Sequence, residues 1–288
     1  MAYSIRKNWV TSFELIRTHP VILLPFIIGA FFEGLALELI YFSTRKPLSF
    51  IASPLIKKFL GEEYIHYPGN LVMLPNVFYY AQVALYIFIG VLMMAIAVNI
   101  FKNIRANLPL RADAIIKNAL KRYISIFIFA VMMVVLIFLI KKADVFLFNK
   151  CAGFAARHIP RALHLIDKLY FPGISLSIFL TNVILQAFFI LTVPILVMQK
   201  KPLLKALAKS IYLSLRNFLY IFIIILLPFV VYLPISLLKS ASTQMIDKTF
   251  PEITLLIAGS GVVIALFIDC FITVCAAQFV LDKEPKDI

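Results

Sequence analysis

Two carboxylates of this chain lie in an unusual setting, inside long runs of apolar residues. Glu33 and Asp269 each fall roughly 18–20 Å from the end of their run that is closer to a chain terminus, at the usual helical rise of about 1.5 Å per residue. A charge at the middle of a bilayer costs about 2.5–3.5 kcal/mol even on the lenient insertion scale. Acids in such runs therefore need a structural or a functional explanation.

Two interpretations of Glu33 and Asp269 stay open. In the first, the two acids form a shared intramembrane site for a proton or a cation. The candidate auxiliary ligands of that site are Gln82, Asn99, Asn182 and Gln186. In the second, each acid is protonated or bonded to a polar neighbour and fixes the register of the helices, as polar residues often do in membranes.

Other residue types that carry chemistry form no recognisable constellation. His158 and His164 are six positions apart, which is not the i, i+4 spacing of a helical metal site. Cys270 and Cys275 are expected to be buried thiols that behave as small hydrophobic residues. The sequence contains no nucleophile elbow, zinc-protease motif or phosphate-binding loop. We therefore expect no metal, no cofactor and no enzymatic activity.

The composition places the chain among membrane proteins. Apolar residues make up 62% of its 288 residues and charged residues 15%, whereas soluble domains contain about 45–50% and about 25%. So much apolar surface also excludes intrinsic disorder. Nine glycines and three cysteines exclude collagen-like and disulfide-framework proteins. A multi-pass membrane protein remains.

Six segments are long enough to cross a bilayer, which takes about 20 apolar residues in a helix. Their runs are continuously apolar, which favours helices over the alternating strands of a barrel. The sequence therefore predicts an all-α polytopic bundle that forms one integral membrane domain over residues 1–288. The predicted spans cover residues 20–42, 77–100, 123–140, 174–198, 218–238 and 253–281.

An even number of spans places both termini on the same side of the membrane. The two short connections on that side, residues 101–122 and 199–217, are rich in Lys and Arg, which favours a cytoplasmic location. The first apolar run is too long for a cleavable signal peptide and contains acids, so we expect it to remain as a span. The sequence thus predicts cytoplasmic termini.

The net charge of +14 is compatible with two kinds of binding partner, nucleic acid or anionic lipid. The basic residues flank the spans and form no separate soluble domain. Lipid headgroups account for them more simply, since each basic residue near an anionic surface contributes about 1 kcal/mol. We expect anionic membrane lipids as partners and no nucleic acid.

An internal repeat links the two short basic connections. Residues 119–127 align with residues 214–222 at an offset of 95, and each copy places a short amphipathic helix before a span. A third such helix is expected near the N-terminus, around Trp9. A helix with one apolar and one basic face lies in the membrane interface. The predicted headgroup contacts are Lys117, Lys121, Lys201, Lys205 and Lys209.

The two longer connections, residues 43–76 and 141–173, are expected to contain structure, because long structureless loops are uncommon. Residues 54–60 form the expected amphipathic turn or helix in the first connection. In the second connection, Pro160 is expected to separate two helical pieces. Both connections are predicted to lie at the opposite membrane interface.

The sequence motifs around the ends of the spans resemble those of a known group of proteins. The segments concerned are residues 12–20 with Leu23-Leu24-Pro25, and Pro194 to Val197 followed by residues 202–207, Ser210 and residues 215–217. This pattern is similar to bacterial six-span proteins related to the membrane domain of glycerophosphoryl diester phosphodiesterases. The soluble phosphodiesterase domain has no counterpart here. The resemblance implies a helical bundle in the bacterial inner membrane and no catalytic residue.

Two classes of function follow as hypotheses. The leading one is a non-enzymatic bundle that binds lipid or a protein partner, or that serves as the membrane subunit of a larger system. The alternative is a small secondary transporter whose site contains Glu33 and Asp269. A membrane-embedded enzyme that acts on lipids ranks third.

Overall fold

The computed structural model describes residues 5–59, 61–67, 69–158, 163–245 and 252–283. Within these ranges the chain folds into helices and turns without a β-strand, so the predicted all-α bundle is confirmed. The N-terminal part contains α1 (Ile5–Thr18), a short 3₁₀ turn (Pro20–Leu23), α2 (Leu24–Phe42), α3 (Ser49–Phe59), a second 3₁₀ turn (Glu62–Ile65), α4 (Gly69–Leu85), a π-helical turn (Tyr86–Gly90), α5 (Val91–Arg105) and α6 (Ala112–Leu120). The remainder contains α7 (Tyr123–His158), α8 (Leu163–Phe189), α9 (Thr192–Met198), α10 (Leu203–Arg216), α11 (Phe218–Met245) and α12 (Ile253–Asp282).

Six segments of the described chain are long and apolar enough to cross a membrane, as predicted. They cover Pro20–Phe42, Gly69–Arg105, Tyr123–Cys151, Leu176–Met198, Phe218–Leu238 and Ile253–Asp282. The second and third are longer than the sequence suggested. The fourth is interrupted by a turn at Ile190 and Leu191, so α8 ends and α9 begins inside the predicted span.

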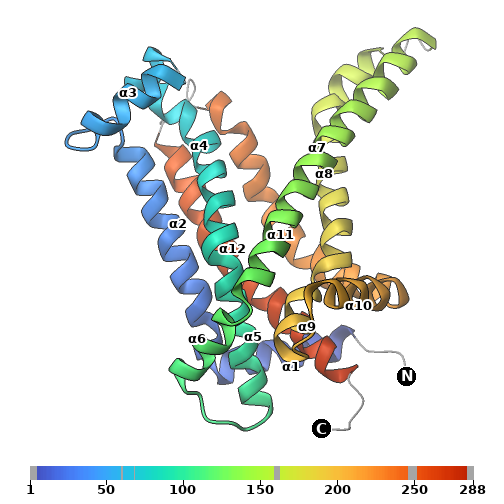
Figure 1. Cartoon of the computed structure of the whole chain (residues 1–288). Helices are drawn as coiled ribbons and strands as arrows, with labels where there is room; N and C mark the ends of the chain where they lie inside the picture. The colour runs from blue at the N-terminus through green and yellow to red at the C-terminus, as the bar shows by residue number, and fades with distance from the viewer. Residues whose placement is uncertain (1–4, 60, 68, 159–162, 246–251, 284–288) are drawn as a thin grey trace.

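The second long connection differs from its prediction. Residues 141–158 continue α7 without interruption, and residues 163–173 belong to α8. The two helices pack together and form a pair that leans away from α2 and α4 (Figure 1). Pro160 lies outside the described residues. The first connection does contain the expected helix, although α3 begins at Ser49 and includes Pro54 within its length.

Helix α12 is the centre of the bundle. It packs against α2, α4, α5 and α11, and its last turns contribute many of the buried side chains. Phe279 and Phe101 are among the largest fully buried side chains, and they belong to one core cluster that also contains residues of α9 and α11. The core is therefore densest at the end of the bundle where α12 finishes.

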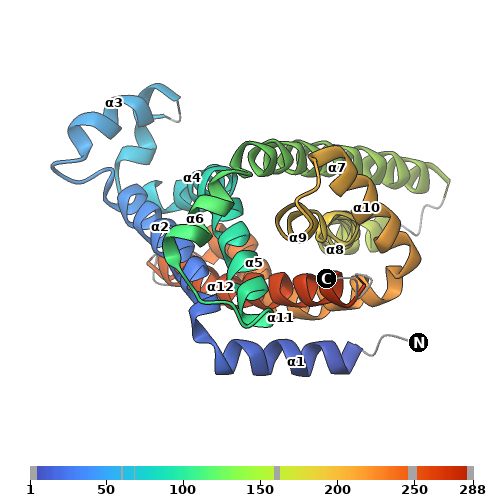
Figure 2. The same cartoon turned by 60° about the horizontal axis from the view of Figure 1, so that its bottom comes forward.

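We call this part of the molecule the terminal end, because α1 and the last turn of α12 both lie there (Figure 1). Helices α1, α6 and α10 occupy different sides of this end, around the ends of α5, α9 and α12 (Figure 2). The opposite end, which carries α3, is called the distal end. The three predicted amphipathic helices are thus present as α1, α6 and α10.

The two turns before α6 and α10 share a backbone conformation, at an offset of 93 positions compared with 95 for the aligned segments. Asn107 and Lys200 are the two non-glycine residues with positive φ in the described chain, at 51° and 54°. Each lies two positions before a proline, Pro109 or Pro202, and each proline precedes an amphipathic helix. The left-handed conformation is uncommon for these residue types and recurs here because both copies make the same turn from a span into the interface.

Candidate functional site

Helix α10 has a buried face of small residues and an exposed apolar face. Ala206, Ser210 and Ser214 are buried, and the Ser210 hydroxyl donates to the backbone carbonyl of Phe188 at 2.8 Å. Small side chains on this face allow the helix to approach α8 closely, as at other helix contacts in membrane proteins. Leu204 and Leu215 lie on another face and are exposed, at 79% and 62% of their surface. The apolar side that the sequence predicted is therefore turned away from the protein, as expected for contact with lipid.

Helix α6 shows the same division of faces. Ile115 and Ala119 are buried, while Ile116 and Leu120 are exposed. In α1, Phe13 is exposed and Asn8 and Ser12 are buried. The side chain of Asn8 donates to the hydroxyl of Tyr220 at 2.6 Å and to the carbonyl of Cys275, so polar contacts hold α1 on the bundle.

The side chain of Trp9 packs against the helix bundle. Its ring packs edge-on against Phe271 of α12, with ring centres 5.5 Å apart. The indole nitrogen is buried and has no hydrogen-bond partner among the described residues. Trp9 thus contributes to the docking of α1.

The two basic connections meet at the C-terminal end of α9. Arg122, which follows α6, donates to the carbonyl of Lys200 at 3.0 Å across 78 positions of sequence. Lys102 donates to the carbonyl of Met198 at 3.2 Å, and Lys209 donates to the side-chain oxygen of Gln199 at 2.7 Å. Cations are favourable at a helix C-terminus, where carbonyl groups lack intrahelical partners.

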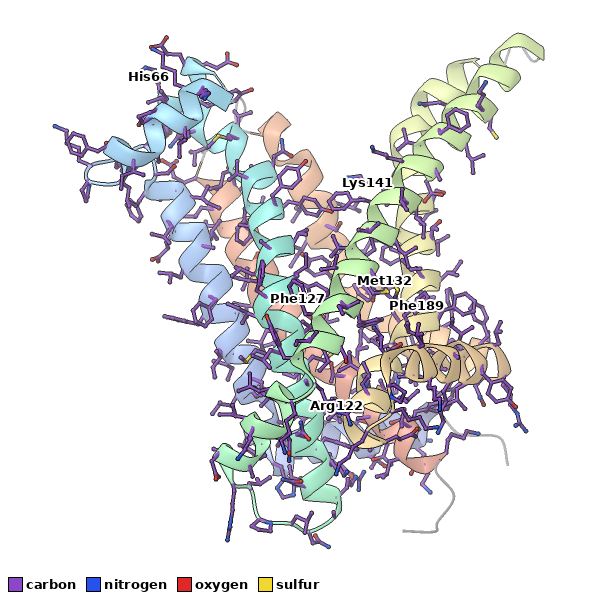
Figure 3. The ribbon with its side chains drawn as sticks, in the orientation of Figure 1. His66, Arg122, Phe127, Met132, Lys141 and Phe189 are labelled. Atoms are coloured by element: carbon purple, nitrogen blue, oxygen red, sulfur yellow. The ribbon has the colours of Figure 1, made fainter. Side chains whose placement is uncertain are left out.

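These contacts link the two basic connections where Arg122 meets Lys200. We group the cations of both connections as the basic surface and define it by Lys117, Lys121, Arg122, Lys200, Lys201, Lys205 and Lys209. Figure 3 shows Arg122 at the terminal end, just before α7 begins, and far from Lys141 within α7. The basic surface lies beside the exposed apolar faces of α6 and α10, which is the arrangement that an anionic membrane surface favours.

The five predicted headgroup lysines all belong to the basic surface, but they differ in exposure. Lys117, Lys121 and Lys205 are exposed, and Lys201 is half-buried. Lys209 is bonded to Gln199, so part of its role is to hold α10 in place. Arg122 was not among the predicted contacts. The Arg122 guanidinium bonds to the backbone carbonyl of Lys200 in a distant loop. Such a contact leaves no pattern in the sequence.

A second candidate site lies within the membrane-spanning part of the bundle. The side-chain nitrogen of Gln82, on α4, donates to a carboxyl oxygen of Glu33, on α2, at 2.6 Å. Both side chains are half-buried. Gln82 is thus the one predicted auxiliary residue for which the structure shows a hydrogen bond to Glu33. A carboxyl group bonded in this way links the two helices in a region that offers no water.

Asp269 of α12 lies near this pair. Its carboxyl group is within electrostatic range of Glu33 and of the Tyr86 hydroxyl, although Asp269 itself is exposed at the surface of the helix bundle. Tyr86 begins the π-helical turn between α4 and α5. Such turns are rare and occur often at functional sites. We call Glu33, Gln82, Tyr86 and Asp269 the intramembrane polar site.

The other candidate ligands have different surroundings. Asn99 donates to the carbonyl of Ala95 in its own helix. Asn182 lies on α8, and its side-chain oxygen has no hydrogen-bond partner in the described part of the chain. Gln186 also lies on α8, and no hydrogen bond of its side chain to Glu33 or Asp269 is observed in the described structure.

Among the residues that the structure describes, no group of three or more His, Cys, Asp or Glu side chains is placed to hold a metal ion. Cys270 and Cys275 are buried free thiols, in agreement with their predicted role. Cys151 is exposed. The side chains of His158 and His164 lie outside the described set.

Comparison of the chain with protein-family models, with curated proteins and with solved structures finds no match.

Proposed function

We propose that this six-span protein is a non-enzymatic membrane bundle that binds anionic lipid headgroups at its terminal end. The observation that carries the proposal is the contact of Arg122 with the carbonyl of Lys200, which joins two basic loops into one surface. A single loop offers a few scattered charges. The joined loops offer a cluster of cations beside exposed leucines.

The exposed apolar faces of α6 and α10 support this function. Leu204 and Leu215 are exposed in the described structure, and Lys205 follows Leu204 on the same helix. A helix of this kind buries its apolar face about 5–10 Å into the boundary between headgroups and acyl chains, and its cations then meet the phosphates. Membrane lipid is thus the partner whose chemistry fits both faces.

The proposal includes a location and an orientation. Basic residues in short loops favour the cytoplasmic side, so the termini and the basic surface face the cytoplasm of a bacterial inner membrane. Anionic lipids of the inner leaflet attract such clusters. This location agrees with the resemblance to the membrane domain of glycerophosphoryl diester phosphodiesterases. A protein partner at the same surface, within a larger system, is compatible with it.

Thermal unfolding in detergent tests the proposed function. Addition of phosphatidylglycerol is expected to raise the free energy of unfolding by about 2.7 kcal/mol at a lipid concentration 100 times the dissociation constant, because the lipid binds only the folded chain. Phosphatidylcholine with the same acyl chains serves as the control. The stabilisation is also expected to shrink in high salt. Equal stabilisation by both lipids contradicts the proposal.

A second candidate function is the movement of protons or cations through the bundle. The hydrogen bond from Gln82 to Glu33 and the nearby Asp269 favour it, since intramembrane acids are common in ion pathways. The parallel repeat is a feature of some transporters as well. This function predicts a flux that lipid binding alone does not produce.

A further inference from the structure

A cavity of about 290 Å³ at the distal end is lined by residues of α2, α3 and α4. Its size is close to the lower end of ligand pockets, at about 300 Å³. The hydroxyl of Ser43 lines it but donates to the carbonyl of Ile40, so it is already satisfied. The other walls are mainly aliphatic and are formed by Leu39, Ile40, Leu55, Ile56, Met73 and Val77.

The mouth of the cavity borders an exposed apolar surface on α3. Ile51 is exposed over 74% of its surface, and Phe50 and Leu55 are exposed beside it. The helix ends with Lys57 and Lys58. An amphipathic helix of this kind lies at the membrane interface. The cavity is therefore lined in part by a helix that suits the interface, and its apolar walls suit a hydrocarbon chain.

Two cations, Arg45 and Lys46, follow Ser43 of the cavity wall by two and three positions in the chain. The Arg45 guanidinium lies 4.9 Å from the ring centre of Tyr41 and donates to its hydroxyl at 3.1 Å, and the Lys46 ammonium lies over the ring of Phe50. These cations therefore rest on aromatic faces and not on carboxylates.

Lys57 differs from them, because it pairs with Glu62 at 2.6 Å. The hydrogen bond from Lys57 holds the pKa of the Glu62 carboxyl below its usual range, so the pair stays ionised and its charges cancel. Residues 43–67 contain four cations, Arg45, Lys46, Lys57 and Lys58, and two acids, Glu62 and Glu63, so this stretch keeps a net positive charge that can attract an anion.

We propose that the cavity receives one acyl chain of an anionic phospholipid, whose headgroup contacts Arg45 and Lys46. The apolar walls account for the chain, and the two cations that follow Ser43 account for the anionic headgroup. The site lies at the opposite end from the basic surface and does not depend on it.

Photolabelling in vesicles tests this site. The full chain is placed in phosphatidylcholine vesicles that contain a trace of phosphatidylglycerol with a photoreactive group on one acyl chain. Labelling of Met73 and Val77 is measured by mass spectrometry relative to Leu139, an exposed residue of α7 that reports bulk lipid. The same trace of photoreactive phosphatidylcholine is the reference probe. We expect the anionic probe to label the cavity at least about fivefold more strongly, which is the effect of about one favourable charge.

Two sets of variants separate the cavity from the two cations. Ala52→Trp fills the cavity and is expected to remove the excess labelling, whereas Ile51→Trp, on the exposed face of the same helix, is expected to keep it. Arg45→Gln with Lys46→Gln leaves the cavity open and is expected to make the two probes equal.

Three results would overturn the proposal. The first is equal labelling by both probes in the unmodified chain. The second is unchanged excess labelling in Ala52→Trp. The third is a decrease in the labelling of Met73 as the number of protein molecules per vesicle rises. That behaviour would assign the cavity to a second copy of the protein.

Discussion

Replacing four lysines of the basic surface with glutamine is expected to lower the affinity for anionic lipid by up to about 10³-fold. Each basic residue near an anionic surface contributes about 1 kcal/mol, and about 1.4 kcal/mol corresponds to a tenfold change. The four are Lys117, Lys121, Lys201 and Lys205. Lys209 is left in place because its bond to Gln199 helps to hold α10.

The measurement is the number of phosphatidylglycerol molecules that stay bound when the protein is released from bilayers of mixed phosphatidylglycerol and phosphatidylcholine. A matched variant with arginine at the same four positions keeps the charge and is expected to retain the lipid. If the glutamine and arginine variants retain lipid equally, charge at this surface does not select the lipid, and the basic surface loses its proposed role.

Gln82→Leu is expected to lower the free energy of unfolding by about 1–3 kcal/mol, because it removes a donor from a half-buried carboxyl group. Asp269→Asn removes a neighbouring acid from Glu33 and is expected to leave stability unchanged or to raise it. Thermal unfolding in detergent measures both. A loss of stability in Gln82→Leu without a loss in Asp269→Asn distinguishes a hydrogen-bonded site from two unrelated polar residues.

Proton flux into sealed vesicles examines the same site for transport. With a pH gradient across the vesicle membrane, a transporter is expected to lose its flux in Glu33→Gln while its stability is kept. Glutamine still offers a side-chain oxygen to Gln82. The absence of flux in the unmodified chain would remove the second candidate function and leave the site a structural link between α2 and α4.

The number of spans was predictable because a helix needs an apolar run of about 20 residues to cross the hydrocarbon core of a bilayer. Phe218–Leu238 is the clearest case, since the predicted and observed spans coincide. Helix ends beyond the membrane were not predictable in this way. Lys141, Lys142 and Asp144 end the apolar run after α7 has crossed, but lysine is a good helix former and the helix continues to His158.

The buried face of α10 illustrates a second limit. The sequence indicates an apolar stripe through Leu204 and Leu215, yet the protein contacts involve Ala206, Ser210 and Ser214. A membrane protein has two apolar surroundings, its own core and the lipid, and hydrophobicity alone does not separate them. Small residues mark the protein side because they allow close helix packing.

The acids of the intramembrane polar site could be predicted from the sequence, but their partners could not. The two acids stood out because charges are costly in a bilayer. Four amides were possible partners, and only the packing of α2 against α4 selects Gln82 from among them. The π-helical turn that places Tyr86 near Asp269 has no sequence signal of its own.

Native mass spectrometry of the protein released from its own membrane in a mild detergent tests the central claim most directly. We expect anionic phospholipids to remain bound to the intact chain, and we expect the variant with four glutamines to retain fewer of them than the arginine variant, because only the basic surface is changed. A chain that emerges without lipid, or with neutral lipid in the proportion of the bulk membrane, would contradict lipid binding at the basic surface.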